Sequence, residues 1–272
     1  MYESYWHLRE KPFEPGVDGG FYYPSETHQA AILKLRYAIE NRRAGALLAG
    51  GSGLGKTLVV AMIRSMLGEK FQPFVHLCFP QMPPDQLMAY LALWLTGGNE
   101  DSDTPLWRSV DRIERFLAKN ADAGRHAVVV VDEAHLLEGQ ETFEAIRLLS
   151  NFETGGRPNL TLVLSGRPGL LPMLDRNPAL EERMAVKGML RPLTETETAQ
   201  YVEHRLVQAG AEGPLFDVEA FEALQQLTQG VPRRINRLCD LALLVGYAEQ
   251  QETVGVSLLE SISEELATVA PE

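Results

Sequence analysis

Glycines, a lysine and a threonine stand at the spacing of a phosphate-binding loop in the segment GGSGLGKT, residues 50–57. The segment matches the pattern GxxxxGK(S/T) at Gly50, Gly55, Lys56 and Thr57. Glycines let the backbone curl so that N–H groups point at phosphate oxygens, and a helix beginning after Gly55 would add its positive dipole end. Lys56 would reach the β and γ phosphates, and the Thr57 hydroxyl would bind Mg2+. The loop predicts a nucleoside triphosphate site, against the alternative of a glycine-rich turn without chemistry.

An acidic pair follows an apolar run further along the chain. Residues 127–131, AVVVV, read as a buried parallel strand that ends at Asp132 and Glu133. This is the Walker B arrangement, in which Asp132 would bind Mg2+, directly or through water, and Glu133 would polarise the water that attacks the γ phosphate. A solvated turn or a helix cap is the alternative for such a pair taken singly. The glycine loop upstream favours an ATPase.

The two motifs predict ATP and Mg2+ as cofactors. The metal ligands are expected to be Thr57 and Asp132, and Glu133 and Lys56 are expected to be catalytic. The residues expected to contact the nucleotide are the loop, the residue after it and the acidic motif: Gly50, Gly51, Ser52, Gly53, Leu54, Gly55, Lys56, Thr57, Leu58 and Asp132.

Strand and helix patterns alternate around these motifs, which is typical of an α/β fold. Five apolar runs are predicted to form a parallel sheet: 46–49, 74–79, 127–131, 160–164 and 186–190. Helices are expected at 57–67, 85–95, 106–119 and 141–152. After Pro192 only helical patterns follow, at 195–208, 218–228, 233–248 and 256–266. We therefore expect an α/β nucleotide-binding domain with an N-terminal extension over 1–192, and a small all-helical lid domain over 193–272.

Composition sets broad limits on function. The chain has 272 residues, of which 45% are hydrophobic, which suffices for a large core and one small additional domain. A formal net charge of −12 argues against a basic surface that binds nucleic acid or anionic lipid nonspecifically, although local clusters could still do so. The N-terminus lacks an apolar signal core, and no apolar run is long enough to span a membrane, so we expect a cytoplasmic protein without membrane insertion.

Cysteines and histidines do not form a metal pattern in this sequence. Cys78 and Cys239 each stand among apolar residues and are expected to be buried, reduced thiols. His28 and His135 have no second ligand at metal spacing, so ordinary surface or core histidines are expected there.

An α/β domain followed by a small helical domain resembles the AAA+ ATPases, which have the P-loop NTPase fold. The resemblance implies a sensor 1 at Ser165, in LVLSGRP, where a polar side chain helps to position the lytic water; a strand-end turn is the alternative. It also implies a sensor 2 at Arg233, in GVPRRINRL, because the segment matches the pattern GxPRxIN of a lid helix. Pro232 suits the first turn of such a helix, and a surface arginine is the alternative reading of Arg233.

AAA+ rings complete each site with an arginine from the neighbouring subunit, since charge developing at the γ phosphate needs a further cation. The segment NPALEERMAVKG lies where the resemblance places this finger. Arg183 is the first choice and Arg176 the reserve, while Arg147 and Arg167 remain alternatives. A surface salt bridge is the competing role for each of them.

Long segments along nearly the whole chain resemble one AAA+ group, the ATPases similar to general secretion pathway protein A. They are MYESYWHLREKPFEP, YYPSETHQAAILKLRYAIENRRAGALLAGGSGLGKT, VVVVDEAHLL, SGRPGL, LRPLTETETAQYVEHRLVQAG and GVPRRINRLCDLALL. The resemblance implies an ATPase of a bacterial secretion, pilus or exopolysaccharide system. It also implies that the chain assembles with itself, into a hexamer-like ring or into a filament. We expect ATP hydrolysis to be slow in the single subunit and faster on assembly.

Two alternatives stay open. The same AAA+ branch resembles the ATPases that regulate transposition, so an ATP-dependent DNA-binding switch is the second hypothesis, with contacts in Lys34, Arg36, Arg42 and Arg43 or in Arg233, Arg234 and Arg237. A solvated helix face is the competing reading of the first cluster. The third hypothesis is a nucleotide-binding structural protein without turnover, against which the presence of Lys56, Asp132 and Glu133 counts.

Overall fold

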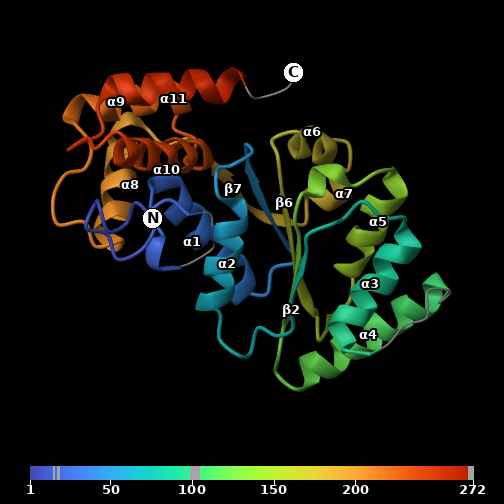
Figure 1. The fold of residues 1–272 in the computed structure, drawn as a ribbon. Coiled ribbons are helices and arrows are strands. Elements are labelled where there is room, and N and C mark those ends of the chain that lie inside the picture. Colours follow the sequence, from blue (N-terminus) through green and yellow to red (C-terminus); the bar gives the residue numbers. More distant parts are fainter. Residues whose placement is uncertain (15, 17–18, 99–104, 269–272) are drawn as a thin grey trace. The chain divides into compact units, whose positions relative to one another are not determined.

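Five parallel strands form the central sheet, as the apolar runs predict (Figure 1). They are β1 (Gly45–Gly50), β2 (Phe74–Leu77), β3 (Ala127–Val131), β6 (Leu160–Gly166) and β7 (Met184–Leu190), in the order β2-β3-β6-β1-β7. Strands β1, β3 and β6 are buried at every residue because helices cover both faces of the sheet. The expected fold class, a P-loop α/β core followed by helices, is confirmed.

The computed structural model describes residues 1–14, 16, 19–98 and 105–268. Most of the polar stretch 97–105 lies outside these residues. The described chain forms two compact units, one of Met1–Glu26, Gly53–Gly55 and Arg191–Glu272, the other of Thr27–Ser52 and Lys56–Leu190. The predicted division into an α/β domain over 1–192 and a helical lid domain over 193–272 stays a prediction.

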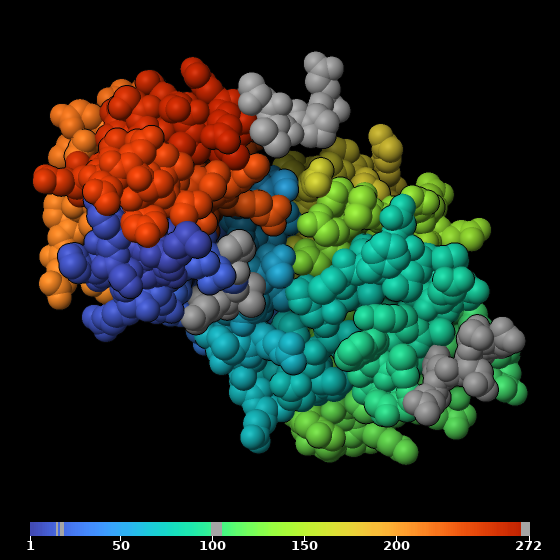
Figure 2. All heavy atoms as spheres, viewed as in Figure 1, coloured from blue at the N-terminus to red at the C-terminus, as the bar shows by residue number. Residues whose placement is uncertain are grey.

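The helices of the sheet-containing unit lie on both sides of the sheet (Figure 1). They are α1 (Glu26–Glu40), α2 (Lys56–Met66), α3 (Pro84–Thr96), α4 (Leu106–Asp122) and α5 (Gln140–Leu149), with the short α6 (Leu170–Asp175) and α7 (Pro178–Glu181) before β7. Figure 1 shows α3, α4 and α5 on one side of the sheet and α1 and α2 on the other. The outer side chains of α3 and α4 lie side by side on the visible face of Figure 2.

Two predicted elements end earlier than expected. The helix predicted to reach residue 152 ends at Leu149, because the chain turns there into a short hairpin of β4 (Glu153–Thr154) and β5 (Arg157–Pro158). The turn between these strands consists of Gly155 and Gly156, both with positive φ (59° and 73°), which glycine adopts without strain.

Strand β2 ends at Leu77 instead of residue 79, and this changes the environment of one cysteine. Its partner strand ends at Val131, which pairs with Leu77, and the last link is a hydrogen bond of 2.8 Å from the Asp132 N–H to the Leu77 carbonyl. Cys78 therefore lies beyond the sheet and is exposed, so the prediction that it is buried was wrong. Cys239 is buried as predicted, and both thiols are free.

The second unit contains α8 (Glu195–Gln208), α9 (Val218–Thr228), α10 (Pro232–Ala248) and α11 (Val256–Thr268). A capping box between Thr194 and Glu197 begins α8, and Pro232 occupies the first turn of α10. The N-terminal residues complete the core of this unit, because the Trp6 ring is buried and its Nε1 donates to the Leu243 carbonyl at 2.8 Å. The sequence patterns did not predict that placement.

A buried histidine lies just before β3. The side chain of His126 is fully buried, and its Nε2 lies 2.8 Å from the hydroxyl of Thr161, which itself donates to the Arg43 carbonyl at 2.7 Å. Since the hydroxyl proton is used, Nε2 carries the proton and donates. Burial, and secondly the nearby Arg42 charge, lower the pKa of His126 from 6.5 to about 4. The folded chain thus keeps this imidazole neutral at pH values at which the unfolded chain protonates it.

The free energy of unfolding is expected to decrease as the pH is lowered, because of His126. A folded-state pKa below the unfolded value means that the contribution is fully present above pH 6.5 and is lost as the pH falls toward about 4. Between pH 7 and pH 5 the loss amounts to about 2 kcal/mol, at about 1.4 kcal/mol for each pH unit below 6.5. Urea unfolding across this range measures it. His126→Gln should flatten the slope while the exposed-site control His7→Gln keeps it; equal slopes in all three proteins would contradict the assignment.

Candidate functional site

The loop between β1 and α2 has a backbone that requires glycine at three positions. Gly53 and Gly55 have φ values of +78° and +88°, a region that favours glycine. A Cβ on Gly50 would lie 2.9 Å from the Leu190 Cβ on β7. The other loop residues differ in exposure, with Ser52 exposed and Leu54 buried. The glycines predicted from the motif therefore shape the loop as a phosphate cradle would require.

Lys56 begins α2 and folds its side chain back over this loop. The residue is 6% exposed, and its Nζ donates to the carbonyls of Gly50 (3.0 Å) and Gly51 (3.3 Å). Thr57 and Leu58 follow in the first turn of α2, with Thr57 exposed and Leu58 partly buried. A buried ammonium that is held by two backbone carbonyls of the loop can form charge-assisted hydrogen bonds with an anion.

Asp132, directly after β3, is the centre of a hydrogen-bonded cluster. Its Oδ2 accepts from the Thr57 hydroxyl at 3.1 Å, and its Oδ1 accepts from the Ser165 hydroxyl at 2.8 Å and from the Glu133 N–H at 3.0 Å. Burial would raise the pKa of Asp132, but hydrogen bonds, with His76 the largest, lower it to about 2. The carboxylate is therefore ionised at neutral pH, and the structure joins four of the predicted site residues, Thr57, Asp132, Glu133 and Ser165.

His76 on β2 belongs to this cluster and was not predicted. Its Nε2 lies 3.3 Å from Asp132 Oδ2, the oxygen that also accepts from Thr57. The pairing of β2 with β3 brings it there, since His76 is in register with Val130. The available signal was a lone polar residue in the apolar run FVHLCF.

Glu133 has a backbone conformation that is uncommon for its residue type. Its φ and ψ are 50° and 35°, in the left-handed region, and such conformations concentrate at functional sites. The side chain is 39% exposed, and its Oε2 lies 3.3 Å from the Nδ1 of His135. Burial lowers the pKa of His135, while the Glu133 charge raises it by a smaller amount. A partly exposed carboxylate beside the ionised Asp132 is in place to meet a water molecule.

The two predicted arginines make other contacts. Arg183 donates through Nη1 to the Ser150 carbonyl at 3.0 Å and through Nη2 to Asn151 Oδ1. The Arg233 side chain is exposed at the start of α10, and its backbone N–H donates to the Gly53 carbonyl at 3.3 Å, within the same compact unit. Among the hydrogen bonds of the described residues, the Arg183 side chain donates none to Asp132.

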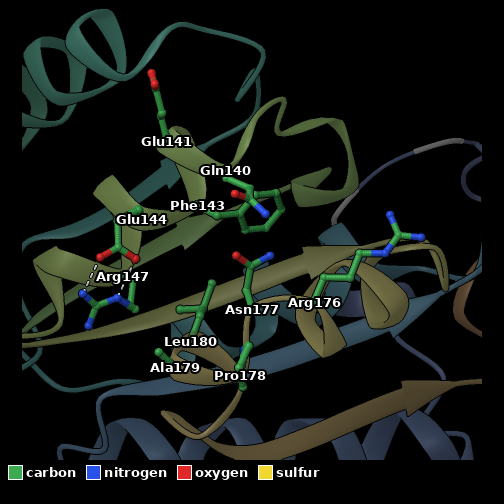
Figure 3. A pocket seen from close by; sticks show the side chains of 10 residues that line it. All are labelled: Gln140, Glu141, Phe143, Glu144, Arg147, Arg176, Asn177, Pro178, Ala179 and Leu180. Atoms are coloured by element: carbon green, nitrogen blue, oxygen red, sulfur yellow. Dashed lines mark hydrogen bonds and ion pairs between the residues drawn. The ribbon is translucent and has the colours of Figure 1, made fainter.

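The reserve arginine, Arg176, and one of the two alternatives, Arg147, line a separate pocket. The pocket has a volume of about 470 Å3 and lies between α5 and the segment of α6 and α7 (Figure 3). Phe143 and Leu180 line it with apolar surface, and the exposed Arg176 stands at its side. Arg147 is ion-paired with Glu144 there. The other alternative, Arg167, is exposed just after β6.

The basic residues of the DNA hypothesis differ between the two clusters. Arg233, Arg234 and Arg237 are exposed on α10. All members of the first cluster have partners within the chain: Lys34 donates to the Lys187 carbonyl, Arg36 pairs with Glu40, Arg42 donates to the Gly124 carbonyl and Arg43 donates to the Tyr37 hydroxyl. These partners agree with the alternative of a solvated helix face.

None of the helices that the structure describes is both long and apolar enough to cross a membrane.

Comparisons with known proteins agree with the fold. A family model described as an AAA domain matches residues 39–174. The chain is 34% identical over 257 residues to the general secretion pathway protein A of Aeromonas hydrophila; the match covers 91% of this chain and 45% of that protein. The chain thus spans less than half the length of this curated relative.

Solved structures of similar fold include two at low sequence identity. The ORC2 protein of Aeropyrum pernix, in complexes with ADPNP and ADP, has a TM-score of 0.69 at 14% identity, with 94% of this chain and 71% of that chain covered. Cdc6p from Pyrobaculum aerophilum has a TM-score of 0.71 at 16% identity, with coverages of 89% and 67%. At such identities the similarity shows the fold alone.

Proposed function

The chain belongs to the AAA domain family, and from this premise we propose that it binds ATP together with Mg2+ and hydrolyses the bond to the γ phosphate. The observation that supports this function best is the hydrogen-bonded cluster in which Thr57 and Ser165 both donate to the Asp132 carboxylate. Asp132 and Ser165 stand at the carboxyl ends of β3 and β6. Open α/β sheets bind their ligands at this edge.

The residues present fit this pair of cofactors. The Lys56 ammonium is buried beside the carbonyls of Gly50 and Gly51, so the loop holds a cation for the phosphates. Thr57 and Asp132 offer a hydroxyl and an ionised carboxylate, which are oxygen ligands of the kind that Mg2+ prefers.

We assign each residue one task in hydrolysis. Mg2+, when bound, neutralises charge on the phosphates. Lys56 exchanges its backbone carbonyl partners for the β and γ phosphate oxygens, and Thr57 and Asp132 hold the metal. Glu133 orients a water molecule and accepts its proton. Ser165 keeps the Asp132 carboxylate in one orientation through its 2.8 Å hydrogen bond and helps to place the water.

Assembly is part of the proposal. Arg233 would face the γ phosphate as sensor 2, and Arg183 would serve the site of a neighbouring subunit. The two contacts of Arg183, to Ser150 and Asn151, hold its guanidinium in a defined position on the subunit surface. Self-association into a ring or filament would then raise turnover by supplying this cation.

Arg183→Ala is expected to leave ATP binding unchanged and to remove the rise in turnover with protein concentration, a loss on the order of 10^3-fold at concentrations where the wild type assembles. Phosphate release per subunit, measured across protein concentrations, checks this, with thermal unfolding to confirm that the variant is folded. Arg176→Ala is the matched variant and should keep the rise. Loss in Arg176→Ala alone would move the finger there, and a wild type without any phosphate release at any concentration would refute hydrolysis.

The cellular role is proposed more broadly. The 34% identity to a general secretion pathway protein supports a role as an energising or assembly component of a bacterial secretion, pilus or exopolysaccharide system. In that setting the chain would act in the cytoplasm and meet envelope components as partners.

A further inference from the structure

His135 lies between the candidate catalytic carboxylate and the loop after β6. It stands in the short helical turn η2 (Ala134–Leu136), and its side chain is 14% exposed. One atom, Nδ1, lies 3.3 Å from Glu133 Oε2 and 3.3 Å from the backbone nitrogen of Arg167. A ring nitrogen of neutral histidine has either a lone pair or a proton, so Nδ1 can satisfy only one of these neighbours at a time.

The chemistry of the two neighbours decides which contact is made. The Arg167 backbone N–H can only donate, so Nδ1 accepts from it and the imidazole proton is on Nε2. The lone pair is then used, and Nδ1 has no proton for the carboxylate. Accordingly, Glu133 Oε2 is buried without a hydrogen-bond donor among the described residues.

The neighbouring glycine is suited to this arrangement. A Cβ on Gly166 would lie 3.2 Å from the His135 backbone nitrogen and 3.3 Å from its Nδ1. Both distances are tighter than most real Cβ contacts. The absence of a side chain at Gly166 therefore allows η2 to approach the end of β6 closely enough for the hydrogen bond to Arg167.

We propose that His135 is a positioning residue for hydrolysis: through Nδ1 it anchors the turn that carries Glu133 to the Arg167 backbone, and it does not pair with the Glu133 carboxylate, whose side chain is 39% exposed and stays available to water. The inference rests on the proposed ATPase function. The anchor keeps Glu133 in its left-handed backbone conformation next to Asp132, and the Nε2–H tautomer prevents the imidazole from pairing with the carboxylate. Arg167 is exposed, so another molecule can contact its loop. A shift of that loop would then change the position of Glu133 through the hydrogen bond between the Arg167 N–H and His135 Nδ1.

Three variants separate the role of Nδ1 from simple packing. In His135→Asn the amide oxygen can take the place of Nδ1, in His135→Gln the amide lies near the position of Nε2, and His135→Phe retains only ring volume. We expect kcat for ATP hydrolysis to fall about tenfold or more in the Phe and Gln variants with KM for ATP unchanged, because a misplaced general base lowers the rate without weakening phosphate binding. His135→Asn should stay within about threefold of the wild type. His7→Phe, at an exposed histidine, is the control and should behave as the wild type.

A second measurement does not depend on turnover. Amide hydrogen exchange at Arg167 should be slow in the wild type and in His135→Asn, and about tenfold faster in the Phe and Gln variants, because the N–H loses its acceptor. The 15N resonances of His135 should show the Nε2–H tautomer.

Equal kcat in all three variants, parallel changes in kcat and KM, or an Nδ1–H tautomer would overturn the proposal. A wild type without turnover would refute the ATPase function, and equal Arg167 exchange in all variants would refute the anchor independently.

Discussion

Replacing Glu133 with glutamine is expected to lower kcat for ATP hydrolysis by at least about 100-fold while ATP affinity stays within about twofold of the wild type. Glutamine has the size of glutamate but cannot accept a proton from water. Glu133 donates to Asp132 through its backbone N–H, which the substitution by glutamine does not change. Phosphate release under saturating ATP and titration with a fluorescent ATP analogue measure the two quantities.

The matched control for this variant is Glu114→Gln, since Glu114 is exposed on α4. It should leave both turnover and affinity unchanged. Turnover within about tenfold of the wild type in Glu133→Gln would show that another group activates the water. A large loss of ATP affinity would instead show that Glu133 contributes to binding.

Lys56→Ala is expected to weaken ATP binding by at least about 30-fold. Hydrogen bonds to charged groups contribute about 2 kcal/mol or more, which corresponds to that factor in the dissociation constant. Isothermal titration with ATP and Mg2+ measures the loss. The side chain also donates to Gly50 and Gly51, so the variant could change the loop itself. Lys56→Met keeps the aliphatic volume without the charge and should lose as much affinity as Lys56→Ala.

Lys119→Ala, at an exposed position near the end of α4, should bind ATP as the wild type does. Unchanged ATP affinity in a folded Lys56→Ala protein would refute the assignment of Lys56 to the phosphates. Loss of affinity with a large fall in thermal stability would point to collapse of the loop, and the Met variant separates these two cases.

Local sequence patterns predicted most elements of this fold correctly. The bounds of α8 and α9 were predicted to the residue, and β3 coincides with the run AVVVV. These patterns suffice because the signals for helices and strands come from residues that are only a few positions apart in the chain. The glycine loop and the acidic pair were found in the same way, since each motif is contiguous in the chain.

Side-chain partners across the sheet could not be predicted in this manner. His76 meets Asp132 because β2 is the neighbour of β3 in the sheet order, and the chain alone does not state which strands pair. Cys78 is exposed because its partner strand ends first. Arg183 was chosen by its place in the segment, whereas its contacts with Ser150 and Asn151 follow from tertiary packing.

The sequence by itself determined the kind of ligand this protein is built for, through residues that are neighbours along the chain: the loop of residues 50–57 and the pair Asp132 and Glu133. The tertiary structure alone decided how these parts meet, by joining Thr57, Asp132 and Ser165 in one cluster and by placing His135 between Glu133 and Arg167. The physical reason is range. Backbone preferences act over a few residues, whereas hydrogen bonds between strand ends depend on how the whole sheet is assembled.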